Sequence, residues 1–215
     1  MAEGLRPEHF RDLNNANNQA PGATHMMVSY IAGLDQAVSL LGESPSEPAE
    51  AEILGLLNTP YPFARYLALR ELGRDPVGDN EKTLLSQLER SAKAGDPVGF
   101  YWTCEAMAHG RIEAAIPALA VYATAEPRAN LHGPLGMGYG LPAAKAIGRI
   151  AGRIEQAEVQ RLLAEKNVWL VAGVLAGLTD ARAAGVRELL VRFSDPWQPA
   201  IIRNEAAVGL RRLAE

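Results

Sequence analysis

The chain has 215 residues, of which 48% are hydrophobic and 6% aromatic, and its 21 Lys+Arg against 25 Asp+Glu give a net charge of -4. This length is enough for one domain, or two small ones, with a continuous apolar core. The sequence holds no charged stretch leading into an apolar run, and nothing near the roughly 18 apolar residues of a membrane span. Secretion and membrane insertion are therefore not expected. The acidic balance also argues against a nucleic-acid partner.

A single cysteine, Cys104, limits the covalent and metal chemistry of the chain. No intrachain disulfide can form, no cysteine cluster can hold zinc or an iron–sulfur centre, and no H-E-x-x-H or paired-histidine spacing occurs. We therefore expect a cytoplasmic protein without a metal and without a cofactor. Cys104 and His109 are five residues apart on an expected helix, a spacing that does not favour a Cys-His nucleophile.

Charge is divided unequally between the two halves of the chain. Residues 1–107 hold 8 Lys+Arg and 15 Asp+Glu, a net charge of -7, whereas residues 108–215 hold 13 and 10, a net charge of +3. An anionic partner would favour the second half. Its arginines are interleaved with glutamates along expected helices, however, and a solvated helical face accounts for most of the pattern.

Apolar residues recur at helical rather than alternating spacing almost everywhere, which predicts an all-α chain. In the N-terminal part we expect a short helix over 6–13, a polar loop over 14–21 and a long helix over 24–42. Two prolines and acidic residues suggest a linker over 43–48. We therefore divide the chain into an N-terminal helical cap and linker, residues 1–48, and a second unit, residues 49–215.

Pairs of helices separated by capping turns fill the second unit. The turns hold helix-stopping and capping residues such as Asn58-Thr59-Pro60, Gly95-Asp96-Pro97 and Ser194-Asp195-Pro196. Equivalent positions in the second helices are 37, 38, 31 and 32 residues apart, and a period in the thirties is typical of stacked helical hairpins. The expected pairs are 49–57 with 61–73, 81–94 with 100–110, 113–123 with 140–152, 155–167 with 168–178, and 181–193 with 201–215.

The turn and the second helix of these units share a pattern carried by Asn58-Thr59-Pro60-Tyr61-Pro62, Arg65, Ala68, Leu69, Leu72 and Gly73, echoed by Arg203, Ala206, Ala207 and Leu210. In this pattern the units resemble HEAT repeats, in particular the short variety also found in bilin lyases. The resemblance covers roughly residues 49–215 and implies a right-handed α-α superhelix, a HEAT-like solenoid of about five hairpins whose second helices line the concave face. The second repeat departs from it, with Tyr101 or Trp102 in place of an arginine, and the third has an oversized turn.

The connection over 126–140, EPRANLHGPLGMGYG, is the most unusual segment, with four glycines, two prolines and His132. Long loops in regular arrays often carry function, and glycines allow backbone amides to approach an anionic ligand. The glycine spacing matches neither a P-loop nor a dinucleotide-binding turn, so a plain long turn is the competing interpretation. His132 is a candidate general base, or else an exposed loop histidine.

Aromatic residues fall on successive repeats and suggest a ladder across the second helices, although the same residues could simply fill space between helices. Aromatic and arginine side chains are the usual anchors of binding sites. The candidate aromatic residues are Tyr66, Tyr101, Trp102, Tyr139 and Trp169, and the polar residues expected beside them are Arg65, Glu105, Lys145, Arg149 and Arg203.

Three functions are compatible with these features. The leading one is a protein- or peptide-binding scaffold that uses the concave face, and it rests on the general use of the fold. The first alternative is an enzyme or a small-molecule-binding protein with a pocket between the 126–140 loop and the second helices, with His132 and Glu105 as candidate catalytic residues. The second alternative is a HEAT-like DNA glycosylase, for which Trp102 and Glu105 are a faint signature.

Overall fold

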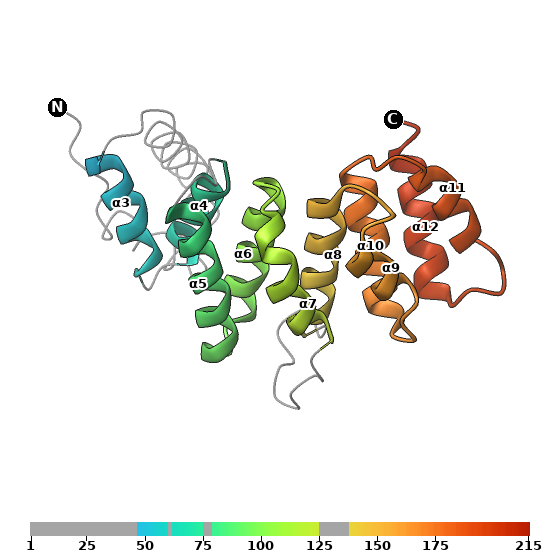
Figure 1. The fold of residues 1–215 in the computed structure, drawn as a ribbon, viewed down its shortest axis with the longest axis horizontal. Helices are drawn as coiled ribbons and strands as arrows, with labels where there is room; N and C mark the ends of the chain where they lie inside the picture. Colours follow the sequence, from blue (N-terminus) through green and yellow to red (C-terminus); the bar gives the residue numbers. More distant parts are fainter. Residues whose placement is uncertain (1–46, 60–61, 75–78, 125–137) are drawn as a thin grey trace, which may run out of the picture.

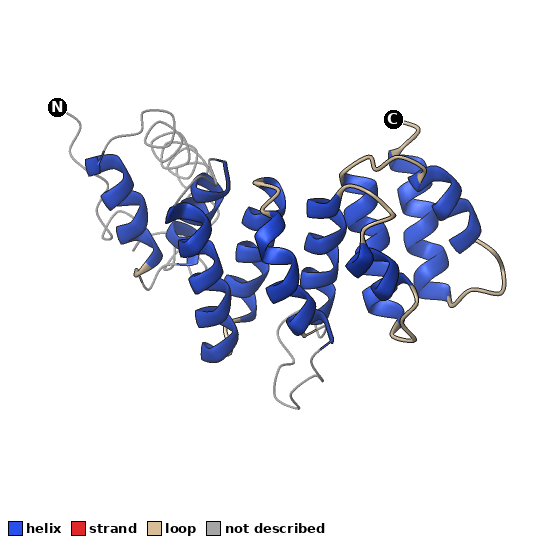
Figure 2. Ribbon diagram, in the orientation of Figure 1, coloured by secondary structure: helices blue, strands red, loops and turns tan. Residues whose placement is uncertain are grey.

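The computed structural model describes residues 47–59, 62–74, 79–124 and 138–215. These residues form ten α-helices and no β-strand, with one 3-10 turn, Glu113–Ala115, before α7 (Figure 2). The all-α prediction is confirmed for these residues, and the expected helices over 1–46 lie outside them. The helices are α3 (Glu47–Leu57), α4 (Pro62–Arg74), α5 (Asp79–Ala94), α6 (Pro97–His109), α7 (Ile116–Thr124), α8 (Gly140–Ala151), α9 (Ala157–Leu163), α10 (Val168–Asp180), α11 (Val186–Phe193) and α12 (Ala200–Arg212).

The helices are arranged in two layers. The even-numbered helices contact one another in order, α4 with α6, α6 with α8, α8 with α10 and α10 with α12. Each odd-numbered helix packs against the even-numbered helix that follows it. Figure 1 shows these pairs following one another along the long axis of the molecule, with α3 near one end and α11 and α12 at the other. We call α4, α6, α8, α10 and α12 the even layer.

Capping side chains fix several helix starts. Asp96 precedes α6 and accepts a hydrogen bond from the Gly99 amide at 2.9 Å, while Pro97 occupies the first helical position, where no amide is needed. Gln156 and Asn167 cap α9 and α10 in the same way. These caps provide hydrogen-bond acceptors for amides that have no partner within the helix, and so they fix the residue at which each of the three helices begins.

Two helices, α9 and α11, are five or six residues shorter than the 13 residues that the apolar pattern predicts for each. The pattern predicts a helix over 155–167, but α9 spans only Ala157–Leu163, because Gln156 and Asn167 act as caps rather than as helical residues. The pattern also predicts a helix over 181–193, but α11 begins at Val186. Arg182 and Gly185 have φ angles of +50° and +72°, in the left-handed region, which interrupts the helix before that point.

One apolar core runs through both layers. Its largest fully buried side chains come from α3 to α10, and smaller contributions such as Leu190 and Ile202 continue the core into α11 and α12. Cys104 lies in this core with 1% exposure, as free cysteines usually do. The fully buried large side chains are Leu56, Leu67, Leu69, Leu84, Leu88, Phe100, Met107, Leu119, Ile147, Leu162 and Leu175.

Glycines permit the close approach of helices α8 and α10. A Cβ atom at Gly148 would lie 2.6 Å from the Val174 carbonyl oxygen, and one at Gly173 would lie 2.9 Å from the Leu141 carbonyl oxygen. A Cβ atom at Gly177 would run into the Lys145 carbonyl oxygen. Because backbone meets backbone at all three positions, no side chain can move aside to make room.

Replacing Gly177→Ala should therefore force α8 and α10 apart and lower the free energy of unfolding by about 1–3 kcal/mol. The matched control is Gly55→Ala in α3, where a Cβ atom would meet nothing within 4 Å. The control should raise stability slightly, because alanine loses less backbone entropy in a helix. Urea denaturation followed by circular dichroism measures both, and equal effects would contradict this account of the α8–α10 contact.

Candidate functional site

Three aromatic rings meet where α4 and α6 lie side by side. The ring centroids of Tyr66 and Trp102 are 4.2 Å apart, and those of Tyr101 and Trp102 are 4.9 Å apart. All three side chains are only partly buried. Packed aromatic rings of this kind offer a rigid apolar area together with a polar end, the hydroxyl or the indole N–H. We call Tyr66, Tyr101 and Trp102 the aromatic patch.

The other two candidate aromatic residues lie elsewhere. Tyr139 precedes the first residue of α8, and its ring packs against Phe100 and Tyr122, with centroid distances of 4.2 and 6.4 Å. Tyr122 comes from α7, so this cluster joins the two layers. Trp169, in the first turn of α10, is 44% exposed. Among the described residues the aromatic contacts thus form two clusters rather than one ladder.

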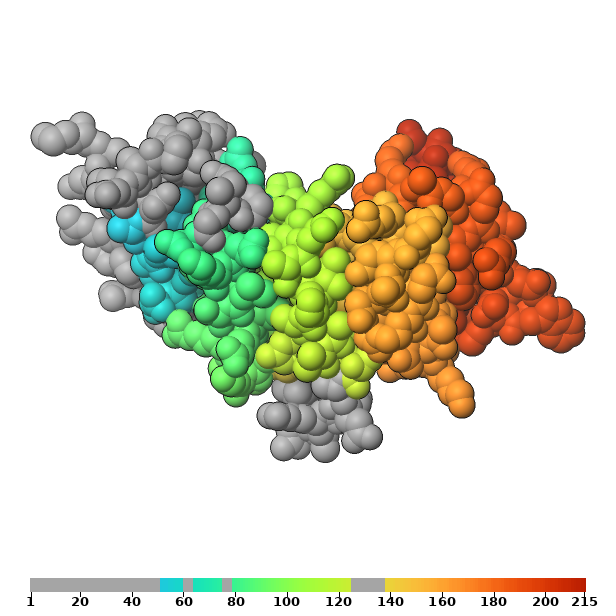
Figure 3. All heavy atoms as spheres, viewed as in Figure 1, coloured from blue at the N-terminus to red at the C-terminus, as the bar shows by residue number. Residues whose placement is uncertain are grey.

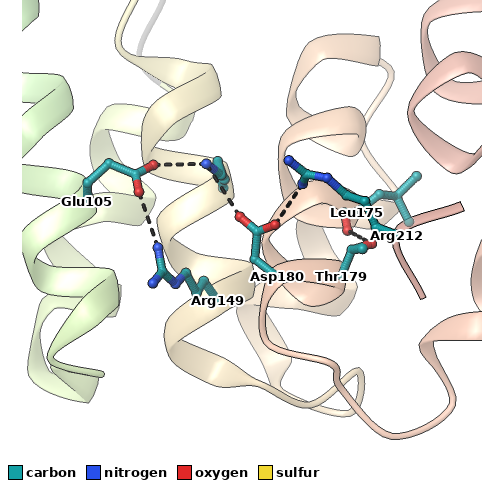
Figure 4. Close-up of polar contacts among 7 residues, drawn as sticks. Glu105, Arg149, Leu175, Thr179, Asp180 and Arg212 are labelled. Atoms are coloured by element: carbon teal, nitrogen blue, oxygen red, sulfur yellow. Dashed lines mark hydrogen bonds and ion pairs between the residues drawn. The ribbon is translucent and has the colours of Figure 1, made fainter. Parts of the chain in front are cut away.

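Beside the aromatic patch, charged side chains of alternating sign connect four helices of the even layer (Figure 4). Glu105 Oε1 accepts from Lys145 Nζ at 2.9 Å, and Glu105 Oε2 accepts from Arg149 Nη1 at 3.2 Å. Lys145 Nζ also lies 3.4 Å from Asp180 Oδ2, and Asp180 Oδ1 accepts from Arg212 Nη1 at 2.8 Å. We call Glu105, Lys145, Arg149, Asp180 and Arg212 the charge ladder.

The charge ladder is partly withdrawn from water. The side chains of Glu105, Lys145, Arg149 and Asp180 are 22–29% exposed. Burial alone lowers the pKa of Lys145, but the hydrogen bond to Glu105 and the charges of Glu105 and Asp180 outweigh it and raise the pKa above its ordinary value. Lys145 is therefore a fixed cation, suited to pairing and unsuited to accepting a proton near neutral pH.

Tyr101 links the aromatic patch to the charge ladder. Burial raises the pKa of its hydroxyl, the nearby Glu105 carboxylate raises it further, and Lys145 partly opposes both. The hydroxyl thus stays protonated at neutral pH and remains able to donate a hydrogen bond. One continuous surface of the even layer therefore carries apolar rings, a phenol donor and ions of both signs.

Three charged residues of this surface were not singled out from the sequence. Asp180 lies beyond the predicted end of its helix, and Arg212 and Glu205 belong to the last helix, α12. The pKa of Glu205 is raised, first by burial and then by Asp180, while Arg212 and Lys145 act in the opposite direction. The seven-residue spacing of Glu205 and Arg212, two helical turns, is the one sequence signal that places them on one face.

Of the remaining candidates, Arg65 and Arg203 lie outside the charge ladder. Arg65 Nη1 donates to Asp96 Oδ2 at 2.9 Å and ties α4 to the cap of α6, whereas its Nε is buried without a hydrogen-bond partner. Arg203 Nη1 donates to the Pro196 carbonyl oxygen at 3.1 Å, so it holds the α11–α12 loop. Both side chains are partly buried, and both act first as structural links between elements.

A second charged group lies on α4. The Glu71 side chain is 1% exposed and accepts from Arg70 Nη2 at 2.6 Å and from Arg74 Nη1 at 2.9 Å. A carboxylate removed from water to this degree is tolerated only when it is paired and hydrogen-bonded. The two arginines are its visible partners, and the arrangement stabilises α4 rather than presenting a free reactive group.

The structure says little in favour of catalysis. His132 and most of the 126–140 loop lie outside the described residues, and both oxygens of Glu105 are engaged by cations. Cys104 is buried, and burial together with the Glu105 charge raises the pKa of its thiol well above the ordinary value, which disfavours a thiolate nucleophile. Across the part of the chain that is described, no three His, Cys, Asp or Glu side chains gather as metal ligands would.

Membrane association through a spanning helix has no support within the described ranges, where every helix is too short or too polar to cross a bilayer. Comparisons of the chain with protein-family models, with curated proteins and with solved structures gave no match. Function must therefore be inferred from the residues and contacts described above.

Replacing Lys145→Met should lower the free energy of unfolding by about 1–2 kcal/mol, because it leaves two half-buried carboxylates short of one cation. Methionine keeps the length and the apolar stem of the side chain. The matched control is Lys82→Met, which breaks an exposed ion pair with Asp79 within α5 and should have no measurable effect. Chemical denaturation measures the free energy of unfolding of both variants. Equal losses for the two would show that the charge ladder does not hold the even layer together.

Replacing Glu205→Gln should stabilise the protein at neutral pH, because the folded state binds a proton at Glu205 more tightly than the unfolded state does. The wild-type chain then loses stability as the pH rises through the interval between the unfolded and folded pKa values. The advantage of the variant should grow across that interval and stay constant above it. Thermal unfolding from pH 4 to 8 tests this, with the exposed Glu113→Gln as control; an advantage that shrinks with rising pH would contradict it.

Proposed function

We propose that the chain is a HEAT-like repeat protein that binds a peptide or an extended segment of a protein partner along the even layer. In this proposal residues 49–215 form a right-handed α-α superhelix, and the even layer lines its concave side. The order of helix contacts supports the proposal, because each hairpin packs on the next as in a repeat array. A cytoplasmic location is part of the proposal, since a lone buried thiol suits a reducing compartment.

The observation that carries the proposal is the meeting of the aromatic patch and the charge ladder on one layer. Trp102, Tyr66 and Tyr101 present partly exposed rings, and Glu105 and Lys145 begin the row of paired ions next to them. Binding energy in protein interfaces is concentrated in aromatic and arginine anchors, while surrounding polar groups set register and specificity. An extended segment crossing successive helices would meet the rings first and the ions along the rest of its length.

The pairing of the ions also favours binding over catalysis. A general acid or base must be free to exchange a proton with a substrate, whereas Glu105 is held by both Lys145 and Arg149. Paired ions keep their side chains in place before a partner arrives, which reduces the entropy lost on binding. The small-molecule pocket and the DNA glycosylase remain predictions from the sequence alone.

A selection from a random peptide library displayed on phage, with the purified chain as bait, tests the proposal. Peptides enriched on the wild-type chain should bind Trp102→Ala at least about tenfold more weakly, because a central aromatic anchor is worth about 1.4 kcal/mol or more. Titration calorimetry with the synthesised peptides provides the affinities, and circular dichroism verifies that the variant is folded.

The matched control is Trp197→Ala, which removes an exposed tryptophan from the α11–α12 loop, outside the even layer. This variant should bind the selected peptides as the wild-type chain does. Peptides that lose affinity for Trp197→Ala but not for Trp102→Ala would place the binding surface elsewhere, and a selection that enriches no peptide would leave the even layer without a demonstrated ligand and count against the proposal.

A further inference from the structure

Apolar side chains are exposed at the C-terminal end of the row of helices. Trp197, in the α11–α12 loop, is 93% exposed, and Val191 on α11 is 56% exposed. Figure 3 shows this orange-to-red part of the chain projecting from the end of the molecule. A tryptophan so completely in water forgoes the stabilisation that burial of its large apolar surface would bring.

The loop that carries Trp197 is ordered by its own hydrogen bonds. The amide of Trp197 donates to Asp195 Oδ1 at 2.9 Å, and the amide of Gln198 donates to the Asp195 carbonyl oxygen at 2.9 Å. Arg203 holds the Pro196 carbonyl oxygen from α12. The exposed ring is therefore presented on a preorganised turn between two prolines, which lowers the entropy cost of using it in a contact.

The solvent side of α11 combines opposite charges with an apolar centre. Leu189 and Leu190 are buried against the rest of the molecule, while Glu188, Val191 and Arg192 are exposed on the opposite side of the helix. In the described chain neither Glu188 nor Arg192 forms an ion pair or a side-chain hydrogen bond, although they stand four residues apart. We call Glu188, Val191, Arg192 and Trp197 the end surface.

We propose that the end surface binds a second copy of this chain, with the two α11 helices antiparallel about a twofold axis near Val191. A twofold contact places each residue against its reciprocal. Glu188 would meet Arg192 of the partner subunit, and Arg192 would meet the partner subunit's Glu188. The dimer would therefore contain two equivalent ion pairs, and each of these charges would gain one partner. The two Val191 side chains pack near the axis, and each Trp197 extends over the start of the opposite α11.

Charge complementarity is the reason for choosing a second copy as the occupant. Glu188 and Arg192 flank Val191 on the same helix face, and this pair complements itself when one helix is reversed. Arg187, a second exposed cation of α11, donates instead to the Leu213 carbonyl oxygen of its own chain at 3.4 Å. A helix of eight residues and one loop make a small interface, so the association should be weak, with a dissociation constant of roughly 1–100 μM. The proposal is independent of peptide binding along the even layer.

Sedimentation equilibrium of the full chain from about 1 to 300 μM, bracketing the dissociation constant expected for a small interface, tests the proposal. The wild-type mass should rise from 23.1 kDa toward twice that value, whereas Val191→Asp should remain monomeric. The matched control is Val121→Asp on α7, where the valine is 65% exposed, and it should associate as the wild-type chain does. A wild-type chain that stays at 23.1 kDa throughout overturns the proposal and leaves the end surface for a different partner.

Charge reversal tests the reciprocal pairing directly. Glu188→Arg should weaken association at least about tenfold, because it sets two cations against each other on both sides of the axis. The double variant Glu188→Arg with Arg192→Glu restores opposite charges and should recover most of the wild-type affinity. Association that survives Glu188→Arg unchanged, or that the double variant fails to recover, overturns the pairing; circular dichroism verifies that each variant is folded.

Discussion

Backbone contact between α8 and α10 sets the spacing on which the even layer depends. Gly148, Gly173 and Gly177 let the two helices approach until the carbonyl groups of one meet the bare Cα atoms of the other. At this spacing Lys145 of α8 lies 3.4 Å from a carboxylate oxygen of Asp180 on α10. Larger residues would hold the helices apart and lengthen that ion pair, so the glycines control the electrostatics as well as the packing.

The charge ladder contributes alignment more than strength. Half-buried ions lose hydration, and their mutual attraction repays only part of that loss, so each pair adds little net stability. The pairs do fix the positions of the helices relative to one another. Lys145 contacts carboxylates on both neighbouring helices, α6 and α10, and Asp180 contacts cations on α8 and α12. The pairs thereby tie α6, which carries Glu105 together with Tyr101 and Trp102, to α8.

The helices could be predicted from the sequence because apolar residues at helical spacing and capping turns are local signals, and α10 appears within two residues of its predicted bounds. Gly185 shows where such signals fail, since its left-handed conformation shortens α11 without a break in the apolar pattern. Glu105, Lys145 and Arg149 could be named as polar candidates beside the aromatic residues. Asp180 and Arg212 could not, because they lie 32 residues apart in the chain and on different helices. Tyr139 lies one residue before α8, as the predicted start at residue 140 implies, and its ring packs against Phe100, a contact between distant residues that the local pattern does not reveal.

The two hydrogen bonds of the Asp96 carboxylate affect how the protein unfolds. One carboxylate oxygen caps α6 while the other accepts a hydrogen bond from Arg65 of α4, so the start of the second helix in one hairpin depends on the second helix of the hairpin before it. If α4 unfolds, α6 loses the partner that orients its cap. Unfolding then spreads to the hairpin of α5 and α6 instead of stopping between the two hairpins. Such coupling of adjacent units turns a chain of separate hairpins into one cooperative segment. A short row of helices can thus resist fraying from its ends.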